Sequence, residues 1–311
     1  MELRHLRYFA AVADAGNVSR AAQRLHVTQP ALSRQMQDLE RDFGCRLFDR
    51  IGRRIVLTRD GDEILERTRQ LLADVEALRE RARTLAGGET GVLRIGAAPQ
   101  FIEAALPGVL TRYATAHPGI EVQLVEDGGD PLLTRVRQGE LHLAIGVFRT
   151  GGLQSQLLYP NRVLAVMQPT HQLAGRNSLT VTELDGVPLL LLGRDFQTRV
   201  LFDEACQSVH FVPSVRLESR SPQSLIALAE AGHGVAIVPS VVRLGASRVA
   251  IAGMLDGARP LGSWSHAVWD ARRYLPTYAR GFIEVVQDYC KTSYPGHQLN
   301  DLTRAVPPSR A

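Results

Sequence analysis

The sequence predicts an α/β protein preceded by an all-α winged helix-turn-helix and a long linker helix. Three observations lead to this fold class. Residues 3–59 contain three helical stretches separated by short breaks and followed by an arginine-rich strand pair. Residues 60–85 repeat apolar positions every three or four residues. Residues 91–291 alternate short apolar runs with helical stretches, which is typical of α/β layers, and are numerous enough for two lobes.

The first two helices are predicted by apolar spacing and by the residues at their ends. Apolar side chains recur at helical spacing through residues 3–13, and Gly16 follows as a stop signal. Asn17 or Ser19 can cap the next helix by accepting a hydrogen bond from a free backbone N–H. His26 and Val27 then form a tight turn.

A third helix is expected to begin after Thr28, which is a good N-cap residue. Pro30 falls in its first turn, where the missing N–H of proline costs nothing. Gly44 ends the helix, and Arg53 and Arg54 then introduce a short strand pair, the wing. The buried stripe of the third helix should consist of Leu32, Met36, Leu39 and Phe43.

This module is predicted to bind DNA, because a helix of this kind fits the major groove with its N-terminal side chains at the base edges. Gln29, Ser33 and Arg34 face away from the apolar stripe, and the wing arginines suit phosphates or the minor groove. Residues 1–58 hold ten arginines and six acidic residues, an excess equal to the whole net charge of +4. The alternative is a three-helix bundle with a solvated polar face. The candidate DNA-binding residues are Thr28, Gln29, Pro30, Ser33, Arg34, Arg50, Arg53 and Arg54.

Residues 60–85 predict a long helix with a narrow apolar seam. The seam positions step alternately by four and three residues for about three heptads, and the outer positions are mainly Glu and Arg. Such a seam is expected to be buried against a second copy, and the alternative is a helix packed on its own domain. Gly87 and Gly88 end the helix and form a hinge. The seam residues are Ile64, Thr68, Leu71, Val75, Leu78, Ala82 and Leu85.

Other features disfavour several classes of protein. Cys45, Cys206 and Cys290 show no metal-ligand spacing, and their sparse, odd number suits a reducing cytoplasm. The N-terminus lacks a signal-peptide pattern, and no apolar run reaches the length of a membrane span. No GxSxG, HExxH or Walker pattern occurs. We therefore expect a cytoplasmic protein that is not an enzyme and that uses no metal, cofactor or membrane.

The stretch VTQPALSRQMQDLERDFGCRLFDRIGRRIVLTRDG, residues 27–61, closely resembles the DNA-binding signature of LysR-type transcriptional regulators. The family outline continues through GVLRIGAA and LIALAEAGHGVAIVPS. The resemblance implies a homotetramer with a two-lobed effector domain like the periplasmic binding proteins (type 2). It also implies a ligand-responsive activator or repressor that binds an interrupted-dyad promoter site, with RNA polymerase as a possible further partner. Asp60 is a mild departure, because the family more often has a small residue there.

These patterns also predict domain boundaries. Residues 1–59 are expected to bind DNA, 60–88 to form the linker helix and hinge, 91–291 the effector domain, and 292–311 a C-terminal tail. RVLAVMQP (162–169) and WSHAVWD (264–270) look like strands that cross between lobes. Lobe 1 is therefore expected at about 91–161 and 265–291, and lobe 2 at about 162–264.

An effector site is expected between the lobes, because ligands of open α/β sheets bind beyond strand C-termini and at helix N-termini. The family often has Ser or Thr after the first strand. Here Pro99 removes a donor and Gln100 supplies an amide, so the pocket should be more apolar and should tolerate an aromatic ligand. The effector is expected to be a small carboxylate or aromatic metabolite. Arg199 either holds an anionic group or pairs with Asp203. The candidate effector-binding residues are Ala98, Pro99, Gln100, Phe101, Gly128, Gly129, Gly146, Val147, Phe148, Phe196, Thr198 and Arg199.

Three alternatives stay open at the level of sequence. Cys206 could act as a redox sensor, as cysteines do in some relatives, or could be a buried structural residue. The α/β region could be a solute-binding or enzymatic domain, with the N-terminal module serving only for assembly. Glu218 and Arg220 could be polar groups of the cleft or an ordinary surface pair.

Overall fold

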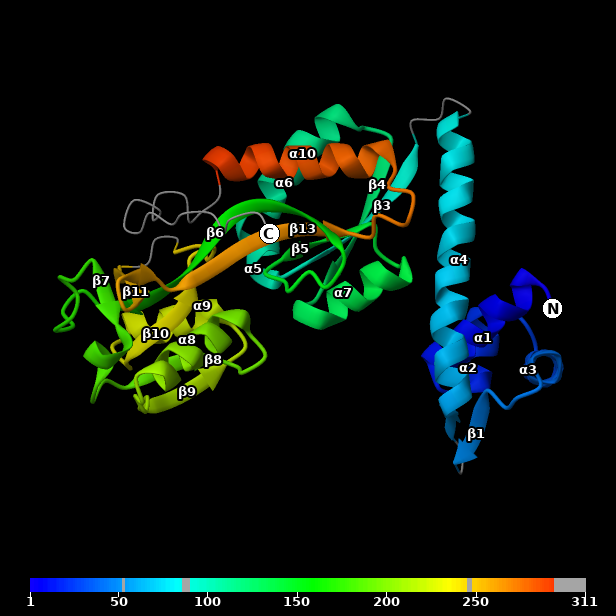
Figure 1. The fold of residues 1–311 in the computed structure, drawn as a ribbon, viewed down its shortest axis with the longest axis horizontal. Helices are drawn as coiled ribbons and strands as arrows, with labels where there is room; N and C mark the ends of the chain where they lie inside the picture. The colour runs from blue at the N-terminus through cyan, green and yellow to red at the C-terminus, as the bar shows by residue number, and fades with distance from the viewer. Residues whose placement is uncertain (52–53, 86–89, 245–247, 294–311) are drawn as a thin grey trace. The chain divides into compact units, whose positions relative to one another are not determined.

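The computed structural model describes residues 1–51, 54–85, 90–244 and 248–293. Within them the chain forms two compact units. The first is built from the N-terminal helices, the wing and the long helix α4, and the second from the strands and helices that follow residue 90 (Figure 1).

The first unit is a helix-turn-helix with a two-stranded wing. Its core is a single cluster of buried side chains from all three short helices, with Phe9, Leu32 and Leu39 almost wholly covered. Asn17, rather than Ser19, caps the second helix by accepting a hydrogen bond from the backbone N–H of Arg20 at 3.1 Å. The elements are α1 Leu3–Ala15, α2 Val18–Arg24, α3 Gln29–Phe43, β1 Phe48–Ile51, β2 Arg54–Leu57 and α4 Arg59–Leu85.

The wing leads into α4 through a small hydrogen-bonded corner. The Thr58 hydroxyl accepts from the N–H of Gly61 at 2.8 Å and donates to the carbonyl of Arg46 at 2.6 Å. Gly61 lies so close to the backbone of Leu47 that a Cβ there would overlap the carbonyl oxygen. The first turn of α4 therefore requires glycine at this position, and Leu65 and Thr68 continue into the core of the unit.

Further along α4 the apolar seam leaves that core. Leu71 is 44% exposed, Leu78 is 70% exposed and Leu85 is also exposed. Leu72 packs on the core instead. The helix therefore uses its first half to join the helix-turn-helix and presents leucines along its second half.

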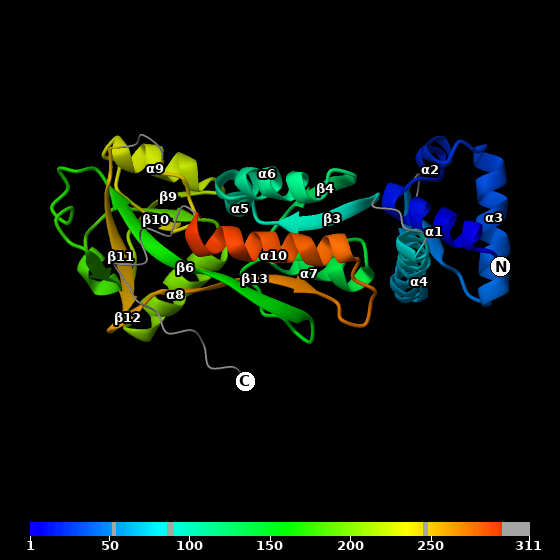
Figure 2. The ribbon, with the colours of Figure 1, turned by 90° about the horizontal axis from the view of Figure 1, so that it is seen from above.

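The second unit has two lobes joined by two long strands, β6 Gln154–Met167 and β13 Gly262–Trp269, which run side by side from one lobe into the other (Figure 2). Their pairing is antiparallel from Gly262↔Arg162 to Trp269↔Gln154. The main path of the sheet is β4-β3-β5-β13-β6-β10-β8-β9. The sheet is therefore continuous through both lobes, and the crossing strands lie at its centre.

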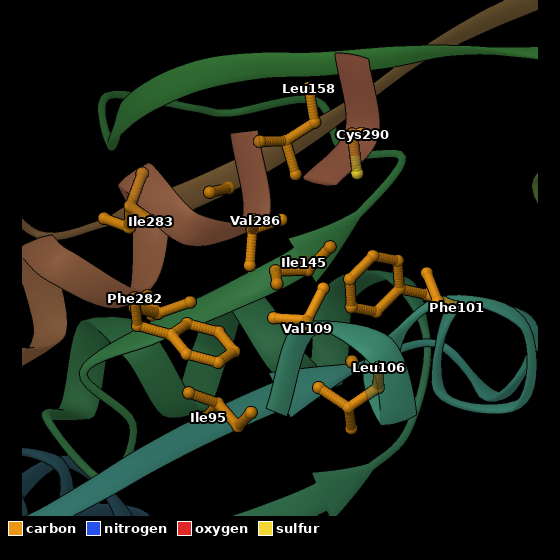
Figure 3. Close-up of a cluster of buried hydrophobic side chains, with 14 of the residues drawn as sticks. Ile95, Phe101, Leu106, Val109, Ile145, Leu158, Phe282, Ile283, Val286 and Cys290 are labelled. Carbon is orange, nitrogen blue, oxygen red and sulfur yellow. The ribbon is translucent and has the colours of Figure 1, made fainter. Parts of the chain in front are cut away.

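Lobe 1 is a parallel sheet covered by helices, because β3 pairs in parallel with both β4 and β5. Its core packs Phe101, Val109 and Phe282 between the sheet and the helices (Figure 3). The hydroxyl of the buried Tyr113 donates to the carbonyl of Tyr278 at 2.9 Å. The elements are β3 Gly91–Ala97, α5 Pro99–Ala104, α6 Leu106–Ala116, β4 Ile120–Glu126, α7 Gly129–Gln138, β5 Leu143–Gly146 and α10 Thr277–Thr292.

Lobe 2 repeats this arrangement with cores on both faces of its sheet, one around Phe202 and the other around Leu225 and Ile226. Strand β8 consists of four fully buried leucines and pairs in parallel with β9 and β10. The elements are β7 Ser178–Thr180, a 3-10 turn Val181–Leu184, β8 Leu189–Leu192, α8 Gln197–Ser208, β9 Val215–Ser219, α9 Pro222–Glu230, β10 Val235–Pro239, β11 Ala250–Asp256 and β12 Arg259–Pro260.

Two elements of the second unit differ from what their sequences predict. Residues 103–116 have the pattern of one helix, but they belong to two helices broken at Ala105, because Pro107 lies in the first turn of α6 and has no N–H to continue α5. Residues Ala250–Asp256 form strand β11, although the AIAGMLD segment is rich in small residues and does not predict a strand. It pairs with the buried half of β6, where Ala252 lies opposite Ala165.

Candidate functional site

The first turn of α3 presents polar side chains above a fully buried stripe. Leu32, Met36 and Leu39 anchor the helix in the core of the unit. Thr28, Gln29, Pro30 and Arg34 are exposed and Ser33 is half-buried. The Gln29 side-chain amide donates to the Ser33 hydroxyl at 2.9 Å, so these two residues act as one polar surface. The predicted base-reading residues therefore lie together at the N-terminal end of one exposed face.

The wing is an antiparallel pair of short strands. Arg50 lies on β1 opposite Ile55, and Arg54 lies on β2 opposite Ile51. The third predicted wing arginine, Arg53, lies outside the described residues. The backbone thus places two of the three wing arginines on neighbouring strands.

The second unit contains a cleft of ≈ 740 Å³ between its lobes. Lobe 1 lines it with the start of α5, the end of β5 and the start of α7, and lobe 2 with the starts of α8 and α9. The predicted effector residues that line the cleft are Ala98, Pro99, Gln100, Phe101, Gly128, Gly129, Gly146, Val147, Phe148, Phe196 and Thr198.

Arg199 is the predicted effector residue that the structure places elsewhere. It does not line the cleft, and its side chain is buried in lobe 2. The guanidinium donates to Asp203 at 2.8 Å, to Glu218 at 2.8 Å and to the carbonyl of Leu192 at 2.9 Å. Because the guanidinium is already bound to these groups, the anion-binding interpretation of Arg199 gives way to the pairing with Asp203.

The floor of the cleft includes residues that sequence reasoning missed. Tyr159 and Asn161 on β6 and Ser265 on β13 line the cleft from the crossing strands. The sequence could have indicated these residues, because a strand that crosses between two lobes must pass beneath the space between them. The Asn161 side-chain oxygen is buried and has no hydrogen-bond partner among the described residues, and the same holds for the side-chain nitrogen of Gln100.

Aromatic rings form much of the cleft wall. The ring of Phe101 stacks on Tyr159, with centroids 6.3 Å apart and planes at 11°. The ring of Phe148 lies over Gly146, where an added Cβ would come within 2.8 Å of it. Glycine at this strand end therefore allows an aromatic side chain to lie beside the cleft.

The charged residues of the cleft are mostly acidic and lie at its rim. Arg220 is the only basic residue among the described lining residues. Its guanidinium lies 2.8 Å from the Asp195 carboxylate and 5.4 Å from the centroid of the Phe196 ring. Arg220 is thus paired with Asp195 of the same lobe, and Glu218 pairs with Arg199 instead of with Arg220. The acidic lining residues are Glu103, Glu126, Asp127, Asp130 and Asp195.

Two family models match the chain. A model of the bacterial regulatory helix-turn-helix of the lysR family covers residues 3–62, and a model of the LysR substrate binding domain covers residues 86–291. The regulator IlvR of Caulobacter vibrioides is 35% identical over 78% of this chain and 84% of its own length. The chain therefore belongs to the LysR family of DNA-binding transcriptional regulators, which combine a helix-turn-helix with a ligand-sensing domain.

Solved structures of the family share the fold over nearly the whole chain. Full-length OxyR from Pseudomonas aeruginosa is 25% identical, covers 94% of this chain and 95% of its own, and has a TM-score of 0.71. CbnR in complex with its target DNA is 28% identical, covers 93% and 99%, and has a TM-score of 0.64. Among the described residues, no helix is both long and apolar enough to span a membrane.

Proposed function

We propose that this regulator recognises a promoter through the exposed first turn of α3 and responds to a small carboxylate or aromatic metabolite bound between its lobes. The observation that carries the DNA-binding assignment is the pairing of Gln29 with Ser33 beside the exposed Arg34. An amide can bond adenine and a guanidinium can bond guanine, while Ser33 serves a base or a phosphate. Thr28 and Pro30 set the approach of the helix, and Arg50, Arg53 and Arg54 hold the backbone.

The test is a double variant, Gln29→Ala with Arg34→Ala, in a binding assay on the promoter DNA that the protein protects. Each lost base contact costs about 1–3 kcal/mol of discrimination, so specific affinity should fall by roughly 10- to 100-fold per residue. The matched control is Gln37→Ala with Arg41→Ala, the same residue types about two turns further along α3. Unchanged specific affinity in the first variant would refute the assignment.

The proposed assembly is a homodimer through α4 and a homotetramer of two dimers. The exposed Leu71 and Leu78 support the dimer, because a seam of this kind is stable in water only when covered. A dimer would place two recognition helices in successive major grooves, roughly 34 Å apart, so the operator should be an interrupted dyad.

The proposed switch is closure of the two lobes around the metabolite, which would re-angle the dimers and change DNA bending. The protein would then activate or repress transcription in the cytoplasm, with RNA polymerase as a further partner. A footprint with and without aromatic metabolites tests this. If no metabolite alters the length of the footprint or the bend of the DNA, ligand switching is refuted.

A further inference from the structure

We propose that the cleft takes an aromatic molecule without a carboxylate, whose polar group is a neutral or cationic hydrogen-bond donor. This inference rests on the proposed role of the cleft as the effector site and specifies the class of ligand. Four features of the cleft carry it: the acidic residues and the proline at its helix N-termini, its acidic rim, two amide side chains that each have a buried atom without a partner, and its aromatic lining.

Three of the helix N-termini that face the cleft carry a resident acceptor, a nearby carboxylate or a proline. Asp130 lies in the first turn of α7, and the Ser221 hydroxyl caps α9 by accepting from the N–H of Ser224. Pro99 removes an N–H at the start of α5. The start of α8 has no side-chain cap, and Asp195 lies two residues before it. At these helix starts a ligand carboxylate would meet carboxylates or fewer N–H groups than an anion-binding site offers.

The rim would also repel an anion. Five carboxylates and one guanidinium line the cleft, and the guanidinium is paired with Asp195. Among the described residues, Glu103, Glu126, Asp127 and Asp130 show no ion pair. Like charges around a low-dielectric hollow raise the local concentration of cations and lower that of anions.

The interior offers neutral hydrogen-bonding groups. Gln100 is only 9% exposed and lines the cleft, and its side-chain nitrogen has no partner among the described residues. The Asn161 side-chain oxygen is likewise buried and without a partner. Because a buried amide atom without a partner is costly, a ligand that supplies the missing bonds gains affinity. Asn161 requires a donor on the ligand, such as a hydroxyl or an ammonium, which a carboxylate does not provide.

The remaining wall is apolar and aromatic. Phe101, which stacks on Tyr159, lines the cleft together with Phe148 and Phe196. Rings bind rings through offset or edge contacts, and they also attract cations through their faces. An aromatic alcohol can satisfy both amides, because its hydroxyl accepts from the Gln100 side-chain N–H and donates to the Asn161 side-chain oxygen. An aromatic amine, as an ammonium, donates to Asn161 only and is favoured instead by the acidic rim.

Three probes that share one ring separate the ligand classes: benzylamine, benzyl alcohol and benzoate. Binding to the full-length protein is measured by saturation-transfer NMR at low salt. Benzylamine and benzyl alcohol should bind with Kd values on the order of 1–10 mM, as small fragments do. Both should weaken at least about fivefold in Asn161→Leu, which removes the acceptor for the donor on the ligand. Benzyl alcohol should weaken similarly in Gln100→Leu, because its hydroxyl oxygen can also accept from the Gln100 amide. Benzoate should bind at least about tenfold more weakly than benzylamine.

Neutralising the rim provides an independent readout of charge. The triple variant Glu126→Gln, Asp127→Asn, Asp130→Asn should weaken benzylamine by about two- to tenfold, tighten benzoate and leave benzyl alcohol unchanged. The control variant, Glu284→Gln with Asp288→Asn, changes two residues of α10 outside the cleft lining. It should leave the affinity for all three probes unchanged.

Two outcomes would overturn the inference. One leaves the proposed effector site standing, and the other overturns it as well. If benzoate binds as tightly as benzylamine and loses affinity in Gln100→Leu, the cleft is the ligand site but the ligand class is wrong. If no probe binds, or if neither Gln100→Leu nor Asn161→Leu changes the affinity of any probe, both the inference and the proposed effector site are wrong. Thermal unfolding of each variant establishes that it is folded.

Discussion

The side-chain Nε of Arg199 donates to both carboxylate oxygens of Asp203, at 2.8 and 2.9 Å. The same guanidinium reaches Glu218 on β9 and the carbonyl of Leu192 at the end of β8. It is only 4% exposed. Arg199 therefore joins α8 to the two strand ends behind the cleft, and its role is to position the lobe 2 wall.

Replacing Arg199 with methionine should destabilise lobe 2 while leaving a side chain of similar length. The change removes charge-assisted hydrogen bonds and leaves the Leu192 carbonyl without this donor, which we expect to cost about 2–4 kcal/mol. Thermal or urea unfolding measures the loss. Arg216→Met, on an exposed position of β9, is the control. A change below about 0.5 kcal/mol, the range typical of surface substitutions, would contradict the role.

The same network predicts a dependence on pH. The hydrogen bond from Arg199, together with its charge, holds the pKa of Glu218 below its ordinary value of 4.5. A carboxyl whose pKa is depressed on folding stabilises the protein above its unfolded pKa, and this stability is lost as the pH falls through the folded pKa. The wild type should therefore unfold at a higher temperature than Glu218→Gln at pH 7, with the difference shrinking below pH 4.5. Glu204→Gln, at an exposed position of α8, is the matched control substitution. A difference that does not vary with pH would count against the Arg199–Glu218 bond.

The seam of α4 predicts a change of oligomeric state. Leu71→Glu with Leu78→Glu would place charges where a second copy should pack, at a cost of about 2–3 kcal/mol for each buried leucine. Analytical ultracentrifugation should then show dissociation of the dimer. Arg67→Glu, an exposed position on the same helix, should leave the assembly unchanged. A dimer that survives both leucine changes would mean that α4 is not the dimer contact.

Cys206 is predicted to be chemically inert in the folded protein. Burial raises the pKa of its thiol to about 11, so the reactive thiolate is scarce at neutral pH. Cys290 is also buried and belongs to the lobe 1 core, whereas Cys206 belongs to a lobe 2 core. Mass spectrometry should find Cys206 unmodified by a thiol reagent until the protein unfolds. Cys206→Ser should bind DNA like the wild type with and without peroxide, and loss of a peroxide response in this variant would favour redox sensing.

Local features were predictable because neighbouring residues decide them. Helix α3 ends at Gly44, which adopts a left-handed conformation with φ of 70°, and Thr28 occupies its N-cap position without a side-chain capping hydrogen bond. The buried face of α3 follows from helical spacing alone. The position of Gln100 and Phe148 in the cleft lining could also be predicted from the sequence, because loops after parallel strands meet at one edge of a sheet.

The first turn of α3, the subject of the DNA-binding prediction, was determined by the sequence itself, because its spacing and caps act within a few residues. The partners of Arg199 and the unpaired Asn161 were decided only by the tertiary structure. Glu218 lies nineteen residues from Arg199 and reaches it through the pairing of β8 with β9. The acidic rim has a similar origin, because Glu103 on α5, Glu126 at the end of β4 and Asp130 on α7 line one cleft only when lobe 1 is folded. Contacts between residues distant in sequence depend on how the chain folds in space, and local patterns do not encode which of them form.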